Sequence, residues 1–359
     1  MTPFWKNTIA ALVLLPVLFI FAVLFSGKPV SDEQYNSLPR KEYQILSAGY
    51  DRNAGNVLAI QPEWKLEDFS SEERFLKSLE APIKQAQQKG LIKKNTLVVF
   101  PAHTGSFLYF LHSRRDVFQR SGLEEAFQVL RYELLLRRSI EKLSGEAENP
   151  VNGTARIYKR IFSNLARTYS VYLLAGSIVS DEAALETIFK DDKSERNLSE
   201  KENEWKEISV LFQPDGKVAK EILYRSPSEN WKRYFDAFQG NVSFAKVPVE
   251  SETTNSLVTV QFPFARFAIF YLETLKNEEF QERVKKTFVS RVVAIGETSS
   301  ETFLKDWASK SNFESTVRIV PSGSYLDLNQ GGGSYVKTRY GAPIPGVNSR
   351  EPLILNLFL

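Results

Sequence analysis

The chain has 359 residues, with 46 Lys and Arg against 43 Asp and Glu and a net charge of +3. This length is enough for one large domain or two small ones. The absence of cysteine excludes disulfides, thiolate metal sites and a cysteine nucleophile, and two histidines argue against a histidine-rich metal site. Basic residues form no stripe with interleaved aromatics, so we expect no nucleic-acid binding. We also expect no metal or other cofactor.

The N-terminal segment has the composition of a membrane helix. Ile9 to Phe25 is almost uninterrupted apolar sequence and approaches the ~20 residues that span a bilayer. Trp5 and Lys6 precede it and Lys28 follows it, as interfacial anchors do. A cleaved signal peptide is the alternative, but its apolar core is usually only ~7–15 residues, and no small-x-small cleavage site follows. The sequence therefore predicts a single-pass transmembrane anchor over residues 1–27.

Residues 28–52 are polar and contain Pro29 and Pro39, which is typical of a linker. We expect this linker to hold the body away from the membrane, on the extracytoplasmic side. The body is predicted to occupy residues 53–350, and residues 351–359 are predicted to form a C-terminal tail.

The body opens with short apolar runs that alternate with helical patterns. Asn56 to Gln61 (NVLAIQ) and Leu97 to Phe100 are predicted to be buried strands, the second ended by Pro101. Between them, residues 71–89 place apolar side chains at helical spacing before Gly90. A second helix is indicated by similar spacing from Leu123 to Leu134, within residues 107–143.

The second half of the chain continues this alternation. Residues 158–179 predict a helix, then a strand at 171–174 closed by Ala175-Gly176-Ser177. Residues 208–224 predict a hairpin around Pro214-Asp215-Gly216. Later elements are strands at 258–273, 292–295 and 316–321, helices near 280–288 and 300–310, and an exposed charged excursion at 180–206.

These motifs, in this order, resemble the nitrilase, or carbon–nitrogen hydrolase, superfamily. The likeness rests on the strand followed by Phe-Pro, the helix–strand–Gly-Ser unit, the strand–Pro-Asp-Gly–strand hairpin and the strand ending in Glu273, and it covers roughly residues 56–347. The resemblance implies an α/β fold, a four-layer α-β-β-α sandwich, here preceded by one transmembrane helix. It also implies chemistry at amide or nitrile carbon, and a possible homodimer.

The family uses a Glu general base, a Lys that stabilises the oxyanion and a Cys nucleophile. Carried over by motif, the Glu position falls on Ala102 and the Lys position on Ser226, after Tyr224-Arg225. The Cys position falls on Tyr271, with Phe270 as the other possible register. None of these side chains can perform the family's catalysis, because alanine accepts no proton and the chain has no thiol.

Two residues near Ala102 are candidate substitutes. His103 and Ser106 together invite a hydrolase interpretation, although no G-x-S-x-G elbow surrounds Ser106 and a structural histidine is the simpler expectation. Arg225 is expected to be a solvated residue at a strand end, with binding of an anionic ligand as the alternative.

Two functions therefore remain open. The first is a membrane-anchored, nitrilase-like protein without the family's catalysis, which acts in binding or assembly. The second is an active hydrolase or acyltransferase on C–N or ester bonds with a relocated nucleophile, such as Ser106 or Tyr271. A closed pocket around Ala102, Ser226 and Tyr271 favours the first, and an open pocket with His103 aimed at a hydroxyl favours the second. The sequence does not name a ligand or a protein partner.

Overall fold

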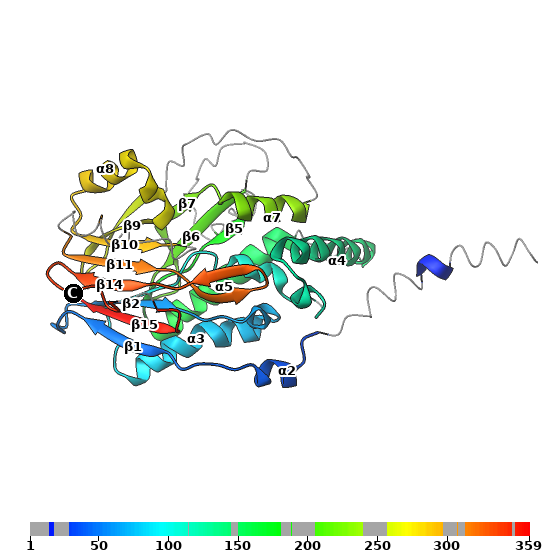
Figure 1. The fold of residues 1–359 in the computed structure, drawn as a ribbon, viewed down its shortest axis with the longest axis horizontal. Coiled ribbons are helices and arrows are strands. Elements are labelled where there is room, and N and C mark those ends of the chain that lie inside the picture. Colours follow the sequence, from blue (N-terminus) through cyan, green and yellow to red (C-terminus); the bar gives the residue numbers. More distant parts are fainter. Residues whose placement is uncertain are drawn as a thin grey trace, which may run out of the picture.

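Two β-sheets stacked face to face form the centre of the molecule (Figure 1). The computed structural model describes residues 14–17, 29–113, 115–144, 150–180, 188, 205–239, 257–296, 307, 313–346 and 349–359. The first sheet has the order β1-β15-β2-β3-β4-β6-β5, with β7 paired to β6. Its strands are β1 (Gln44–Ala48), β2 (Asn56–Gln61), β3 (Thr96–Val99), β4 (Tyr172–Leu174), β5 (Ile178–Ser180), β6 (Lys206–Phe212), β7 (Val218–Arg225) and β15 (Leu353–Phe358).

The second sheet has the order β14-β11-β10-β9-β8, and a separate hairpin pairs β12 with β13. Parallel pairing joins β9, β10 and β11, so their carboxyl ends lie at one edge. The strands are β8 (Leu257–Gln261), β9 (Arg266–Tyr271), β10 (Arg291–Ile295), β11 (Ser315–Ile319), β12 (Ser322–Tyr325), β13 (Leu328–Gly331) and β14 (Tyr335–Thr338).

Helices cover the outer faces of both sheets. The α-helices are α2 (Asp32–Ser37), α3 (Glu72–Gln88), α4 (Leu123–Ser144), α5 (Pro150–Tyr169), α7 (Glu229–Gln239) and α8 (Glu278–Lys286). Short 3₁₀ turns are η1 (Leu66–Phe69), η2 (Ser106–Phe110), η3 (Val117–Gln119) and η4 (Leu272–Lys276). Both α3 and α5 pack on the same outer face of the first sheet.

Strand alternation divides the core between the layers. In β2, Val57 and Ala59 belong to the apolar cluster between the two sheets, whereas Leu58 and Ile60 belong to the cluster under α3 and α5. Successive residues of a strand point to opposite faces, so such a run is buried on both sides. In β9, Ile269 and Tyr271 face the first sheet, and Phe270 packs outward against α8. The layer order is thus α-β-β-α, as predicted.

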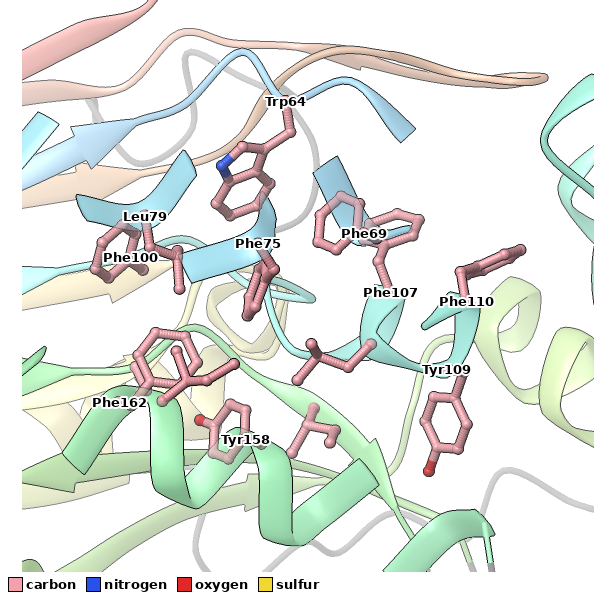
Figure 2. Close-up of a cluster of buried hydrophobic side chains, with 14 of the residues drawn as sticks. Trp64, Phe69, Phe75, Leu79, Phe100, Phe107, Tyr109, Phe110, Tyr158 and Phe162 are labelled. Carbon is pink, nitrogen blue, oxygen red and sulfur yellow. The ribbon is translucent and has the colours of Figure 1, made fainter. Parts of the chain in front are cut away.

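The side chains that join the first sheet to its helices are mostly aromatic. Figure 2 shows Phe100 at the end of β3, Tyr158 and Phe162 on α5, and Phe75 from α3 in one cluster. Phe162 lies edge-on to Phe75 and Phe100, with ring centroids 6.2 and 5.9 Å away. Burying one such side chain contributes roughly 1.5–3 kcal/mol, so this layer is a major source of stability.

Local signals explain why the predicted hairpin forms. Gly216 has φ +84°, a left-handed conformation that glycine adopts without strain, and its N–H donates to the carbonyl of Gln213 (2.8 Å). The Asp215 carboxylate accepts from the N–H of Lys217 (3.0 Å), and Ser163 of α5 donates to the Gly216 carbonyl (2.6 Å). The turn is therefore fixed from within and from the helix that covers it.

The sheet extends beyond both predicted boundaries of the body. Residues 28–52 were predicted to form a linker, yet they contain α2 and β1, and Val30 and Tyr35 are buried. Residues 351–359 were predicted to be a tail, yet β15 lies between β1 and β2. Ile354 of β15 belongs to the cluster under α3 and α5, and Leu355 belongs to the cluster between the sheets, so both faces of this apolar strand are covered.

Three predicted segments fall wholly or mostly outside the described residues. Only residues 14–17 of the predicted membrane helix are described, and they are helical and exposed. In the described part of the chain, no helix has the length and apolarity needed to cross a membrane. The predicted charged excursion at 180–206 and the predicted helix at 300–310 lie largely outside the description as well.

Candidate functional site

A buried carboxylate lies at the carboxyl edge where the two sheets meet. Glu207, in β6, is fully buried. Its Oε2 accepts from Nε of Arg225 (2.7 Å), its register partner on β7, and its Oε1 accepts from the hydroxyl of Ser177 (2.5 Å). Nε2 of His103 lies 3.5 Å from the same Oε1. The charge of Glu207 is therefore compensated inside the protein, as a buried carboxylate requires.

Arg225 links this carboxylate to the second sheet. The residue is 7% exposed, and its NH1 donates to Oε2 of Glu273 (2.9 Å), just after β9. Its guanidinium also lies over the ring of Tyr271, 4.4 Å from the centroid. The prediction of a solvated strand-end arginine is wrong, because both neighbouring carboxylates and an aromatic face hold the guanidinium inside.

Tyr271 reaches from the second sheet into the same cluster. Its hydroxyl donates to the backbone carbonyl of Glu207 (3.2 Å) and lies 3.3 Å from the hydroxyl of Ser209. Burial, and next the negative charge of Glu207, raise the pKa of Tyr271 well above its usual value. The phenol therefore stays protonated at neutral pH, which disfavours it as a nucleophile or base.

His103 contributes a fully buried imidazole ring. Its backbone is in the left-handed region (φ +60°), which directs the imidazole under α7, where it stacks on Trp231 with 4.0 Å between centroids. The backbone N–H of His103 donates to the hydroxyl of Ser177 (2.6 Å), and the ring Nδ1 lies 3.3 Å from the hydroxyl of Ser106. Ser106 also accepts from the N–H of Val179 (3.1 Å).

Gly176 lets the loops after β3 and β4 approach closely. A Cβ atom at this position would lie 1.9 Å from the carbonyl oxygen of Pro101 and 2.1 Å from the hydroxyl of Thr104, so only glycine fits. Tyr158 on α5 donates to the Gly176 carbonyl (2.8 Å). This contact between loops sets Ser177 beside His103 and Glu207.

The three positions carried over from the family have different surroundings. Tyr271 is fully buried in the cluster, Ala102 is 1% exposed beside His103, and Ser226 is exposed. Of the two possible registers on β9, Tyr271 faces the first sheet, whereas Phe270 faces Trp307 on the outside. The neighbours of Ala102 and Ser226 in the chain, His103 and Arg225, meet Tyr271 around Glu207.

Sequence reasoning missed three members of this cluster: Glu207, Ser177 and Trp231. Glu207 and Arg225 form an ion pair there. Glu207 stands at the start of the apolar run Ile208 to Phe212, and a charge on an otherwise buried strand was the available signal. Trp231 carried no such signal, because its position depends on how α7 packs over the loop.

The order Ser106–His103–Glu207 has the residue types of a serine–histidine–carboxylate relay. All three side chains are fully buried, however, and Ser106 is engaged by the backbone of β5. A substrate carbonyl needs open space beside the nucleophile, so this geometry is that of a closed structural network. Among the described residues, no group of three or more His, Asp or Glu side chains could hold a metal ion.

The fold has the layer order that the sequence resemblance implies. It is an α-β-β-α sandwich, with the hairpin β6–β7 beside β4 and the strand β9 ending before Glu273.

Searches for similar proteins gave structural matches alone. No family model and no curated protein matches the chain. It is similar to a variant of the amidase from Nesterenkonia sp. AN1 that shows covalent addition at the active-site cysteine (13% identity, 87% of this chain and 93% of that chain, TM-score 0.49). It is also similar to Nit3 of Saccharomyces cerevisiae, a nitrilase-superfamily member (13%, 83% and 86%, 0.47). A third is the glutamine-dependent NAD+ synthetase from Acinetobacter baumannii (12%, 84% and 44%, 0.49).

Proposed function

We propose that this chain is a membrane-anchored protein with a carbon–nitrogen hydrolase fold that lacks thiol-dependent amidase activity and acts in binding or assembly. The observation that carries the proposal is the closed cluster around Glu207. Its carboxylate is bonded to Ser177 and Arg225, and Tyr271, to which the sequence resemblance assigns the nucleophile position, is fully buried. Without a cysteine in the chain, no thiolate can attack an amide carbon there.

The closed cluster is tested by an activity assay on the full chain. We expect no turnover of a panel of amides, nitriles and esters by the purified protein, and the same result for Tyr271→Phe and Ser106→Ala. Turnover that either substitution abolishes would contradict the proposal. It would instead support the alternative, an acyltransferase or hydrolase with a relocated hydroxyl nucleophile.

The alternative draws on one specific observation, the 3.3 Å separation between Nδ1 of His103 and the hydroxyl of Ser106. It needs Ser106 to become accessible, since the side chain is fully buried. For this reason we favour the binding role.

The membrane anchor is part of the proposal. Ile9 to Phe25 supports it by its apolar sequence, and Leu14 and Leu15 are exposed. Membranes containing the full chain should retain it after a carbonate wash and release it with detergent. Release by carbonate alone would contradict the anchor while leaving the interpretation of the Glu207 cluster intact. We further propose that the body lies on the extracytoplasmic side of the membrane. Access of a protease to the body in sealed vesicles tests this orientation.

A further inference from the structure

Two aromatic side chains are almost fully exposed at one edge of the second sheet. Phe288 follows α8 and is 93% exposed, and Tyr340 follows β14 and is 91% exposed. The register places Arg291, Ser315 and Thr338 in one row across β10, β11 and β14. The two turns that carry the aromatic rings therefore leave the sheet at the same edge, from strands that lie two strand spacings, or about 10 Å, apart.

The turn at Phe288 is fixed to the body, while its ring stays outside. The hydroxyl of Thr287 donates to the carbonyl of Val284 (2.7 Å), and both Val284 and Val289 are buried. Phe288 itself has φ +52°, in the left-handed region that is unfavourable for a bulky side chain and natural for glycine. A phenylalanine here gains neither burial nor a relaxed backbone from the fold, which points to a partner that covers the ring.

Backbone hydrogen bonds tie the turn at Tyr340 to the turn at Phe288. The N–H of Arg339 donates to the carbonyl of Glu314 (2.8 Å), and the N–H of Glu314 donates to the carbonyl of Ser290 (2.7 Å). The guanidinium of Arg339 also lies over the ring of Tyr340, 5.4 Å from its centroid. Aromatic rings that a fixed backbone presents in this way lose little conformational freedom when a partner binds, which favours their use as contacts.

The two turns and the end of α8 carry mostly positive charge. Residues 282–291 and 338–341 contain five cations: Arg283, Lys285, Lys286, Arg291 and Arg339. The acid within these stretches, Glu282, pairs with Lys285, and the neighbouring Glu314 pairs with Arg291. Positive charge is therefore in excess, which favours an acidic partner. It disfavours a second copy of the chain, because that copy would bring the same charges to the contact.

The position of these turns in the molecule selects a protein partner over a lipid surface. Figure 1 shows α8 and β14 at the end of the molecule that lies away from residues 14–17. With the proposed anchor in a bilayer, Phe288 and Tyr340 face the aqueous compartment.

We infer that Phe288 and Tyr340 dock an acidic segment of another protein. Apolar side chains of that segment cover the two rings, and its carboxylates meet the cations of the neighbouring turns. The inference rests on the proposed binding role, and it names the surface that performs this role and the chemistry of the partner.

Selection of peptides against the full chain tests this surface. Phage that display short random peptides are selected on the full chain in phosphatidylcholine nanodiscs, after binders to Phe288→Gly have been removed. Glycine relaxes the left-handed backbone at this position, so Phe288→Gly should unfold at the same or a higher temperature than the unmodified chain. The affinity of the selected peptides is then measured by fluorescence anisotropy for Tyr340→Ser and for the control Tyr132→Ser, which removes a 63% exposed aromatic ring on α4.

We expect the selected peptides to contain more acids than bases, together with apolar side chains. They should bind Tyr340→Ser roughly tenfold more weakly than the unmodified chain, and Tyr132→Ser equally well. Added salt should weaken their binding. The inference is overturned if no peptide is enriched over Phe288→Gly, if the enriched peptides are neutral or basic, or if Tyr340→Ser binds them normally.

Two further results would assign the surface to another occupant and overturn the inference as well. Self-association of the full chain that Phe288→Gly abolishes would indicate a second copy. Loss of peptide binding when phosphatidylglycerol replaces phosphatidylcholine in the nanodiscs would indicate anionic lipid. Failure of the selection without turnover of amides removes only this surface, whereas turnover contradicts the proposed function whatever the peptides do.

Discussion

Arg225 and Glu207 form a buried ion pair between two neighbouring strands, with 2.7 Å between Nε and Oε2 and side-chain exposures of 8% and 0%. The same guanidinium lies over Tyr271 of the other sheet and binds Glu273 at the end of that strand. One side chain thus connects both sheets and fills the space between their strand ends with the protein's own charges.

Glu207→Gln should destabilise the protein by about 3–5 kcal/mol, since removing one charge of a buried pair leaves the other without full compensation. The matched control is Glu282→Gln, whose exposed pair with Lys285 is worth at most about 1 kcal/mol. Denaturant unfolding followed by tryptophan fluorescence measures both. A Glu207→Gln variant as stable as the control would show that the pair is not the structural centre described here.

Trp231→Ala should cost roughly 3–5 kcal/mol and free the ring of His103, because the indole is 1% exposed and stacks on the imidazole. Trp231→Phe should cost less, since an aromatic face remains. The chain contains only His103 and His112, so NMR of histidine side chains resolves the effect. An unchanged His103 signal in the alanine variant would contradict the stack as the constraint on the ring.

Tyr35 should make the protein sensitive to alkali. Burial, and next the charge of Asp68, raise the pKa of Tyr35 to about 12 from its ordinary 10. The stabilising contribution of the neutral phenol is therefore complete below pH 10 and is lost as the pH rises toward 12. Tyr35→Phe should lose less stability over this range than the unmodified chain. An equal loss in both would assign the sensitivity to other tyrosines.

Deleting residues 1–28 should leave a folded body, whereas deleting residues 1–52 should not. The longer deletion removes β1, which pairs with β15 along its whole length, and the buried Val30 and Tyr35. Circular dichroism and size-exclusion chromatography of the two truncations compare them directly. A well-folded 53–359 fragment would restore the prediction that residues 28–52 are a linker.

The sequence contained enough to predict the layers. Buried strands such as β2 and β3 are continuous apolar runs, and α3 repeats apolar residues every three or four positions, so local pattern and tertiary role agree. The boundaries were less predictable. β1 is short and partly exposed. β15 was predicted to be a tail, because only its long-range pairing with β2 reveals its place inside the sheet.

The candidate site was predictable by position more than by chemistry. Strand ends placed Tyr271 and His103 at the correct edge. The partner of both, Glu207, comes from a strand that runs in the opposite direction, and pairing between strands is set by the whole sheet. The burial of Arg225 depends on that partner, so the sequence alone suggested a solvated arginine.

The most direct test of the closed site is intact-mass spectrometry of the full chain after exposure to a fluorophosphonate. An activated serine hydroxyl forms an oxygen–phosphorus bond with this reagent and releases fluoride. We expect no adduct on the folded protein, because Ser106 is fully buried and bonded to the backbone N–H of Val179. A stoichiometric adduct that maps to Ser106 and disappears in Ser106→Ala would contradict it.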